Sequence, residues 1–139
     1  MTFDATSRRG VALFWLPVII WAGVIFAFSA TPNLRVAQAA DVDFMVRKAG
    51  HMFVFGVLAV LLWRALTPSV VRHAMVWSWV LTVAYAASDE FHQSFTAGRH
   101  PSPVDVGIDS FGALLFLLAL TLWLRSRRAP SGAPRQDND

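Results

Sequence analysis

The feature that most constrains this chain is a long uncharged segment near its N-terminus. The residues from Gly10 to Leu34, GVALFWLPVIIWAGVIFAFSATPNL, carry no charge and follow Arg8 and Arg9. A helix needs roughly 20 apolar residues to cross the hydrocarbon core of a bilayer. A cleaved signal peptide has a shorter apolar region, about 7–15 residues, and here further apolar segments follow. The sequence therefore predicts a transmembrane helix over about residues 11–30.

Three further apolar runs follow, and each is short: Ala49–Trp63, His73–Ser88 and Ser110–Leu124. As a helix, each covers about 22–24 Å of a ~30 Å hydrocarbon core, so a soluble helical bundle is the alternative reading. The runs are apolar all round rather than along one stripe, which is typical of membrane or fully buried helices. We therefore expect each helix to extend past its flanking charges. The expected spans are about residues 46–65, 72–93 and 104–125.

The composition agrees with a membrane protein and excludes several kinds of site. Of 139 residues, 55% are hydrophobic and 15% are charged, against about 25% charged in globular proteins. The absence of cysteine excludes disulfides, thiolate metal sites and a cysteine nucleophile. No basic stripe with interleaved aromatic residues indicates a nucleic-acid partner. The expected fold is all-α, a polytopic membrane protein with a bundle of four transmembrane helices and the lipid bilayer as its partner.

The distribution of Lys and Arg predicts the orientation, since these residues favour the cytoplasmic side of a membrane. With the N-terminus inside, the inner set is Arg8, Arg9, Arg64, Arg72, Arg125, Arg127, Arg128 and Arg135, and the outer set is Arg35, Arg47, Lys48 and Arg99. This excess predicts that both termini are cytoplasmic. Residues 1–127 form one predicted membrane domain. Residues 128–139, rich in Pro, Gly and polar residues, are a predicted disordered cytoplasmic tail.

Antiparallel spans bring most of the remaining polar residues to the outer side. The residues at these outer helix ends are Lys48, His51, Asp89, Glu90, His92, Gln93, Asp105 and Asp109. Ionisable residues at membrane depth are costly, normally face the bundle interior, and mark a substrate, ion or proton site. Gly112 shares a helix face with Asp105 and Asp109 and is expected to allow close helix approach. Arg99 lies in the loop TAGRHPSPV and is expected to fold back over the helix ends.

At these residues the chain resembles the VanZ-like family of small bacterial membrane proteins. The resemblance covers about Phe28–Phe116 and rests on the segments FSATP, KAGHMFVFGVLAVLLWRAL, AYAASDEFHQSFTAGR and VDVGIDSFGALL. The positions that match the family pattern are Lys48, His51, Asp89, Glu90, Gln93, Gly98, Arg99, Asp105 and Gly112. His92 falls where the family tolerates other residues. Asp109 stands where the family commonly has Asn, so its charge departs from the pattern.

The resemblance implies a multi-pass protein of the bacterial inner membrane and a role in the cell envelope. The family is named for a protein that gives low-level resistance to teicoplanin, a glycopeptide that binds cell-wall precursors. The resemblance implies an architecture and candidate residues, and it leaves the reaction open.

One interpretation of the polar cluster is an enzyme that acts on a lipid-linked phosphate or pyrophosphate of the envelope. Lys48 and Arg99 can hold a phosphate. Either histidine of the cluster can act as general acid or base, oriented by Asp89 or Asp105. The catalytic candidates are Lys48, His51, Asp89, Glu90, His92, Gln93, Arg99 and Asp105, and the substrate-binding candidates are Lys48, Arg99 and Asp109.

A metal site is a second chemical interpretation, although the sequence indicates no particular cofactor. His51, His92 and two carboxylates supply ligand types that suit Zn, Mn or Mg. Lys48, three residues before His51, opposes a bound cation.

Non-enzymatic interpretations also stay open. The cluster can bind a glycan-lipid, an antibiotic or a partner protein without turnover. It can also be structural, because buried ion pairs specify helix arrangement even where they add little stability. The pairs expected on the structural interpretation are Lys48 with Asp89 or Asp105, and Arg99 with Glu90 or Asp109.

Overall fold

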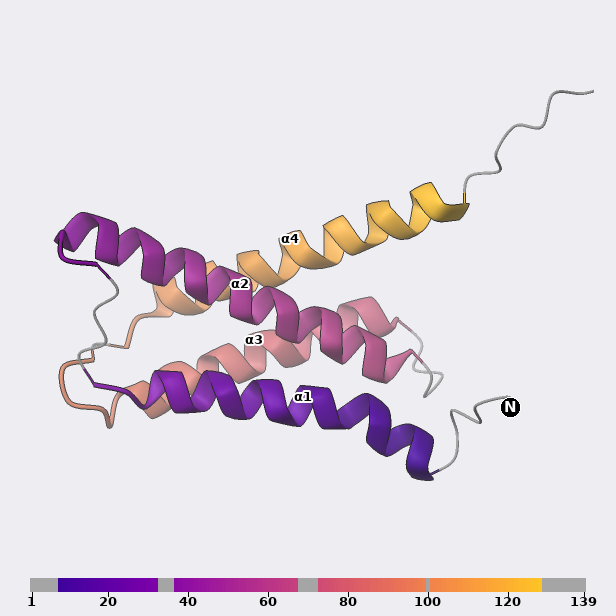
Figure 1. The fold of residues 1–139 in the computed structure, drawn as a ribbon, viewed down its shortest axis with the longest axis horizontal. Helices are drawn as coiled ribbons and strands as arrows, with labels where there is room; N and C mark the ends of the chain where they lie inside the picture. Colours follow the sequence, from indigo (N-terminus) through magenta and orange to yellow (C-terminus); the bar gives the residue numbers. More distant parts are fainter. Residues whose placement is uncertain (1–7, 33–36, 68–72, 100, 129–139) are drawn as a thin grey trace, which may run out of the picture.

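The computed structural model describes residues 8–32, 37–67, 73–99 and 101–128, and these form four α-helices and no strand. The helices are α1 (Arg8–Ser29), α2 (Ala40–Leu66), α3 (Ala74–Gln93) and α4 (Pro103–Arg128). Successive helices run in opposite directions along the bundle (Figure 1). The all-α prediction is therefore confirmed. The predicted tail lies outside the described residues except for Arg128, the last residue of α4.

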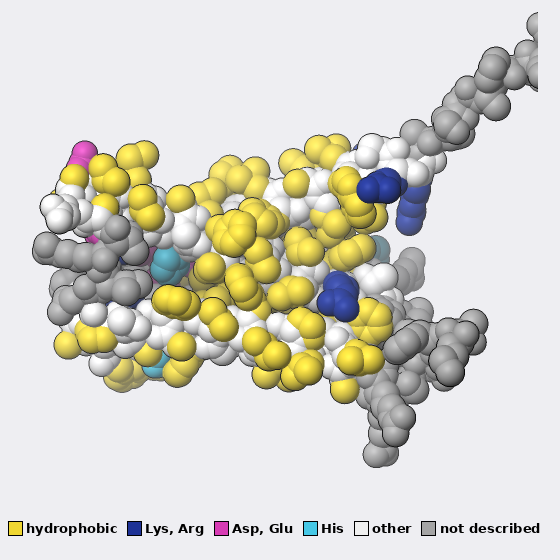
Figure 2. All heavy atoms as spheres, in the orientation of Figure 1, with side chains coloured by type: hydrophobic (Ala, Val, Ile, Leu, Met, Phe, Trp, Pro, Cys, Tyr) yellow, Lys and Arg dark blue, Asp and Glu magenta, His cyan; other side chains and the backbone are white. Residues whose placement is uncertain are grey.

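Three of the described helices are long and apolar enough to cross a membrane, namely the segments Val11–Ser29, Ala40–Leu66 and Pro103–Arg128. The third helix, α3, has 20 residues and carries Asp89 and Glu90 near its C-terminus, and it does not belong to this group. Large apolar side chains are exposed on all four helices, and hydrophobic side chains are spread along the whole bundle in Figure 2. Such an apolar surface is more compatible with contact with lipid than with water. These are the properties of a membrane protein.

The second helix occupies the centre of the bundle. It contacts α1, α3 and α4, whereas α1 and α4 do not contact each other within the described residues. Its first residue is Ala40, ahead of the span expected to start near residue 46. Asp41 and Asp43 lie in the first turn, where negative charge is favourable next to the positive end of the helix dipole. As a consequence, Lys48 and His51 lie about two and three turns inside α2.

Two glycines set the close packing of α2 against α4. A Cβ atom on Gly56 of α2 would overlap the ring of Phe116, and a Cβ atom on Gly112 of α4 would overlap the backbone of Met52. The close approach expected at Gly112 is therefore confirmed. This contact presses the first turns of α4, which carry Asp105 and Asp109, against the segment of α2 that carries Lys48 and His51.

The two ends of the bundle differ in their charges, and we name them accordingly. The arginine end carries Arg64 at the end of α2 and Arg125, Arg127 and Arg128 at the end of α4, and Figure 2 shows dark blue basic side chains at this end. The polar end comprises the C-termini of α1 and α3, the first half of α2, the start of α4 and the loop that holds Arg99. Hydroxyls between the two ends donate to carbonyls of their own helices, Thr82 to Ser78 at 2.7 Å and Thr121 to Leu117 at 2.8 Å, and the Thr121 hydroxyl also lies 3.5 Å from the Met75 sulfur of α3.

Candidate functional site

His51 and Asp109 form a pair across the interface of α2 and α4. The Nδ1 atom of His51 lies 3.3 Å from both carboxylate oxygens of Asp109. The Asp109 side chain is 1% exposed, whereas the His51 side chain is 26% exposed. The aspartate beside His51 is thus Asp109, rather than the Asp89 or Asp105 that the sequence indicates. The reason is the close contact of Gly112 with Met52, which brings the preceding turn of α4 against the residue before Met52.

Lys48 and Asp105 form a second bridge between the same two helices. Lys48 Nζ donates a hydrogen bond to Asp105 Oδ1, and both side chains are partly exposed. Lys48 precedes His51 by three residues and Asp105 precedes Asp109 by four, so the two bridges lie one turn apart on facing helix surfaces. This is one of the pairs that the structural interpretation of the cluster expects.

Asp89, Glu90 and Gln93 of α3 are buried, and the two carboxylates form no ion pair among the described residues. Gln93 Nε2 donates to Asp89 Oδ2 at 2.9 Å, and the backbone N–H of Ser102 donates to Glu90 Oε2 at 2.8 Å. The other carboxylate oxygens, Asp89 Oδ1 and Glu90 Oε1, are buried without a hydrogen-bond partner in the described part of the chain. Buried polar atoms of this kind are uncommon and call for a proton, water or ligand.

Arg99 folds back over the end of α1, as expected from its loop. The preceding residue, Gly98, has φ 78°, a left-handed conformation that glycine adopts readily. One terminal nitrogen of Arg99 lies 3.5 Å from the Phe28 carbonyl and 3.3 Å from the Thr31 carbonyl. These carbonyls lie at the C-terminus of a helix, where a cation is favourable. Within the described residues Arg99 pairs with neither Glu90 nor Asp109, contrary to the ion pairs of the structural interpretation.

His92 packs against α1. Its ring stacks on Phe26 of α1, with centroids 4.0 Å apart and planes at 26°. Within the described ranges, no three His, Asp or Glu side chains come together in an arrangement that could hold a metal ion. The metal interpretation therefore gains no support from these residues.

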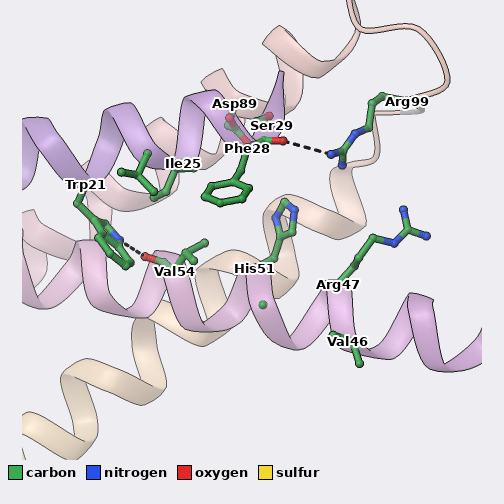
Figure 3. A pocket seen from close by; sticks show the side chains of 12 residues that line it. Trp21, Ile25, Phe28, Ser29, Val46, Arg47, His51, Val54, Asp89 and Arg99 are labelled. Atoms are coloured by element: carbon green, nitrogen blue, oxygen red, sulfur yellow. Dashed lines mark hydrogen bonds between the residues drawn. The ribbon is translucent and has the colours of Figure 1, made fainter. Parts of the chain in front are cut away.

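A groove of about 360 Å³ lies between α1 and α2 and extends to the polar end. His51, Asp89 and Arg99 reach it, together with Arg47 and the C-terminal half of α1, as Figure 3 shows. From the sequence, Arg47 is one of the outer basic residues but not one of the candidate site residues, and α1 supplies none. The sequence does contain a feature that indicates Arg47 as a site residue: Arg47 precedes His51 by four residues, so the two share a helix face. No comparable signal marks the contribution of α1.

The chain was compared with protein families, with curated proteins and with solved structures. A family model described as VanZ/LLP1 matches residues 14–124. No significant match was found among the curated proteins or the solved structures. The matched range contains α2 and α3 entire, most of α1 and α4, and every residue of the two bridges and the groove. The chain therefore belongs to the VanZ/LLP1 family.

Proposed function

We propose that this protein crosses the bacterial inner membrane four times, with both termini in the cytoplasm and the polar end on the outer face. Three helices have the length and hydropathy of membrane spans. The remaining helix, α3, returns the chain from the arginine end to the polar end (Figure 1). Its 20 residues measure about 30 Å as a helix, equal to the ~30 Å hydrocarbon core. The arginines at the opposite end favour a cytoplasmic location for that end.

The polar end, on this proposal, binds a phosphate-bearing, lipid-linked component of the cell envelope and acts on it. The observation that carries the proposal is the His51–Asp109 pair, which lies beside a groove that two arginines also reach. A carboxylate that engages one ring nitrogen of a histidine fixes its tautomer and leaves the other nitrogen for proton transfer. Arginine presents a fork of donors that suits phosphate oxygens.

The reaction that fits these groups is hydrolysis of the phosphate ester. With Asp109 accepting a hydrogen bond from Nδ1–H, Nε2 of His51 carries the lone pair that removes a proton from the attacking water. The oxygen of that water bonds to phosphorus, and the bond from phosphorus to the departing oxygen breaks. The protonated ring then returns the proton to the departing oxygen. Arg99 and Arg47 stabilise the charge on the phosphate, whereas Lys48 is engaged by Asp105.

A structural role is the second candidate, favoured by the two consecutive bridges between α2 and α4. Such bridges can fix the rotation and axial position of one helix on another without any ligand. On this alternative, loss of a bridging charge removes the folded protein from the membrane rather than removing an activity.

The test uses purified protein in lipid vesicles, incubated with labelled envelope lipids that carry one or two phosphates. A released phosphate or a shortened lipid supports the enzyme, and a bound but unchanged lipid supports a binding protein. The variants Lys48→Ala, Glu90→Ala and Arg99→Ala are expected to lose the activity and to retain normal membrane levels. If Lys48→Ala, which removes a bridging charge, disappears from the membrane while Arg64→Ala at the arginine end does not, the structural role is correct.

The link to teicoplanin implied by the family is tested in cells. Expression of the protein is expected to decrease teicoplanin susceptibility, and the His51→Asn variant is expected to lose this effect. Equal susceptibility of cells with and without the protein would contradict a role in resistance.

A further inference from the structure

We propose that the groove between α1 and α2 holds the hydrocarbon chain of a single-chain amphiphile whose phosphate monoester head group lies between Arg47 and Arg99. The amphiphile reaches this site sideways from the outer leaflet. The inference rests on the proposed function, because it names the class of lipid that the polar end receives and the path by which it arrives.

The groove is amphipathic along its length. At one end Ile25 and Val54 face each other, and the indole of Trp21 closes this end by donating a hydrogen bond to the Val54 carbonyl at 2.8 Å. At the other end lie the guanidinium groups of Arg47 and Arg99 (Figure 3). An apolar slot with a cationic mouth complements a hydrocarbon chain that ends in an anion.

The size and the position of the groove indicate one chain and a lateral opening. Its volume, about 360 Å³, is near the lower limit of the ~300–1,000 Å³ found for small-ligand pockets, which favours one chain over two. Val24 and Phe28 line the groove and are 36% and 61% exposed, so they border its opening. They lie on α1, a helix that carries large exposed apolar side chains along its length, so the groove opens where lipid is expected.

The cations at the mouth retain donors for a phosphate. Among the described residues, the Arg99 guanidinium donates hydrogen bonds to the backbone carbonyls of Phe28 and Thr31. Arg47 uses its Nε atom on Asp43 at 3.0 Å. A guanidinium has five N–H donors, so both arginines keep donors beyond these contacts, and both residues line the groove. Two such groups and His51 side by side favour an anion between them.

Two buried atoms beside the mouth lack partners and fit a phosphate monoester. Ser29 Oγ and Asp89 Oδ1 have no hydrogen-bond partner among the described residues, and these residues are 5% and 4% exposed. Both residues line the groove. The hydroxyl of Ser29 can donate to a phosphate oxygen. The carboxylate oxygen of Asp89 can accept the hydrogen of a phosphate that is singly protonated, a hydrogen that a phosphodiester lacks.

The first test maps the chain. The protein is placed in phosphatidylcholine nanodiscs with hexadecyl phosphate that carries a diazirine in its chain, and the cross-linked peptides are identified by mass spectrometry. We expect cross-links to the lining residues of α1 and α2, with Val24, Phe28 and Val54 foremost. Cross-links spread evenly over the exposed faces of α3 and α4 would overturn the inference.

The second test fills the groove. Gly50 lines it, and a Cβ atom there meets nothing within 4 Å, so Gly50→Phe occupies the groove without an internal clash. We expect binding of hexadecyl phosphate to weaken ~tenfold or more. The matched control is Gly107→Phe in α4, where a Cβ atom also meets nothing within 4 Å and which does not line the groove. Circular dichroism of both variants verifies that they fold.

The third test concerns the head group. Arg47→Gln and Arg99→Gln are each expected to weaken hexadecyl phosphate ~tenfold and to leave hexadecanol unchanged. Hexadecyltrimethylammonium, the two-chain phosphatidic acid and inorganic phosphate are expected to bind more weakly than hexadecyl phosphate.

The outcomes separate this inference from the proposed function. If phosphatidic acid or inorganic phosphate binds as tightly, or if Gly50→Phe has no effect while Arg99→Gln does, the groove is not the chain site. A phosphate site at the polar end then stands without it. If hexadecyltrimethylammonium binds best, the proposed head group is wrong. If no phosphate-bearing probe binds at all, the inference and the proposed function both fail.

Discussion

The two ends of this bundle hold their basic residues in opposite surroundings. At the arginine end, Arg64, Arg125, Arg127 and Arg128 are exposed. At the polar end, the carboxylates of Asp89, Glu90 and Asp109 are buried, and the basic groups pair with carboxylates or line the groove between α1 and α2. Exposed charges interact with solvent or lipid head groups and need no partner of defined geometry. Buried charges need specific partners. The side chains of the polar end must therefore adopt a more precise arrangement than those of the arginine end.

The arginines themselves show the same contrast. Arg127 lies over the ring of Trp123, with its guanidinium carbon 5.0 Å from the ring centroid, and Arg64 lies 5.2 Å from the centroid of Phe14. These contacts involve neighbouring apolar rings only. Arg99 instead bonds to the carbonyls at the end of another helix and reaches a groove. The first arrangement agrees with an anchor for a helix end, and the second agrees with the ligand site that we propose.

The largest expected effect is an all-or-none difference in accessibility between the two ends. The chain has no cysteine, so a single cysteine at position 99 or 127 is a clean probe. A membrane-impermeant maleimide is expected to label position 99 in intact cells and position 127 only after permeabilisation. The opposite pattern would invert the proposed orientation.

Next in size is the effect of separating α2 from α4. In Gly112→Val, the new side chain overlaps the Met52 backbone and forces apart the helices that hold both bridges. We expect a loss of about 3 kcal/mol or more in the free energy of unfolding, measured by chemical denaturation in detergent. Gly107→Val in the same helix meets open space and is expected to cost far less. Equal destabilisation by the two variants would argue against the close contact.

The variant His51→Asn is expected to change stability less than Gly112→Val does, and to lower turnover clearly. Loss of a general base is expected to lower turnover of the phosphate ester ~100-fold, while the melting temperature stays close to that of the parent protein. His73→Asn at the other end is the matched control, because His73 is exposed with φ 64° and Asn tolerates this conformation. A parallel loss of turnover in both variants would remove the distinction between the two ends.

The smallest effect is expected at the arginine end. Arg127→Ala removes one contact with the Trp123 ring, worth about 0.5–1 kcal/mol at an exposed site. The free energy of unfolding is expected to change by no more than this, and turnover is expected to be unchanged. A loss of activity from Arg127→Ala would place functional charge at the end we regard as an anchor.

Much of the fold follows from the sequence, because apolar runs and alternating helix directions are one-dimensional properties. The four helices, the gathering of Lys48, His51, Asp89 and Asp105 at one end, and the close contact at Gly112 all agree with the expectation. The start of α2 differs from the expectation. The helix begins earlier and includes Asp41 and Asp43, which precede the apolar segment that defines the expected span. Helix boundaries of this kind depend on capping and dipole effects rather than on hydropathy.

By itself the sequence determined that this is a helical membrane protein of the VanZ-like kind with its polar residues at one end. Residue spacing along a helix decides which side chains share a face, and the count of apolar residues decides what can cross a bilayer. Only the tertiary structure decided the partners: His51 with Asp109, Lys48 with Asp105, Arg99 with the end of α1, and a groove flanked by Arg47. Partner choice depends on how far α4 slides and rotates against α2. That position is set where Gly112 lets it touch the backbone at Met52, a contact between distant parts of the chain that no local spacing encodes.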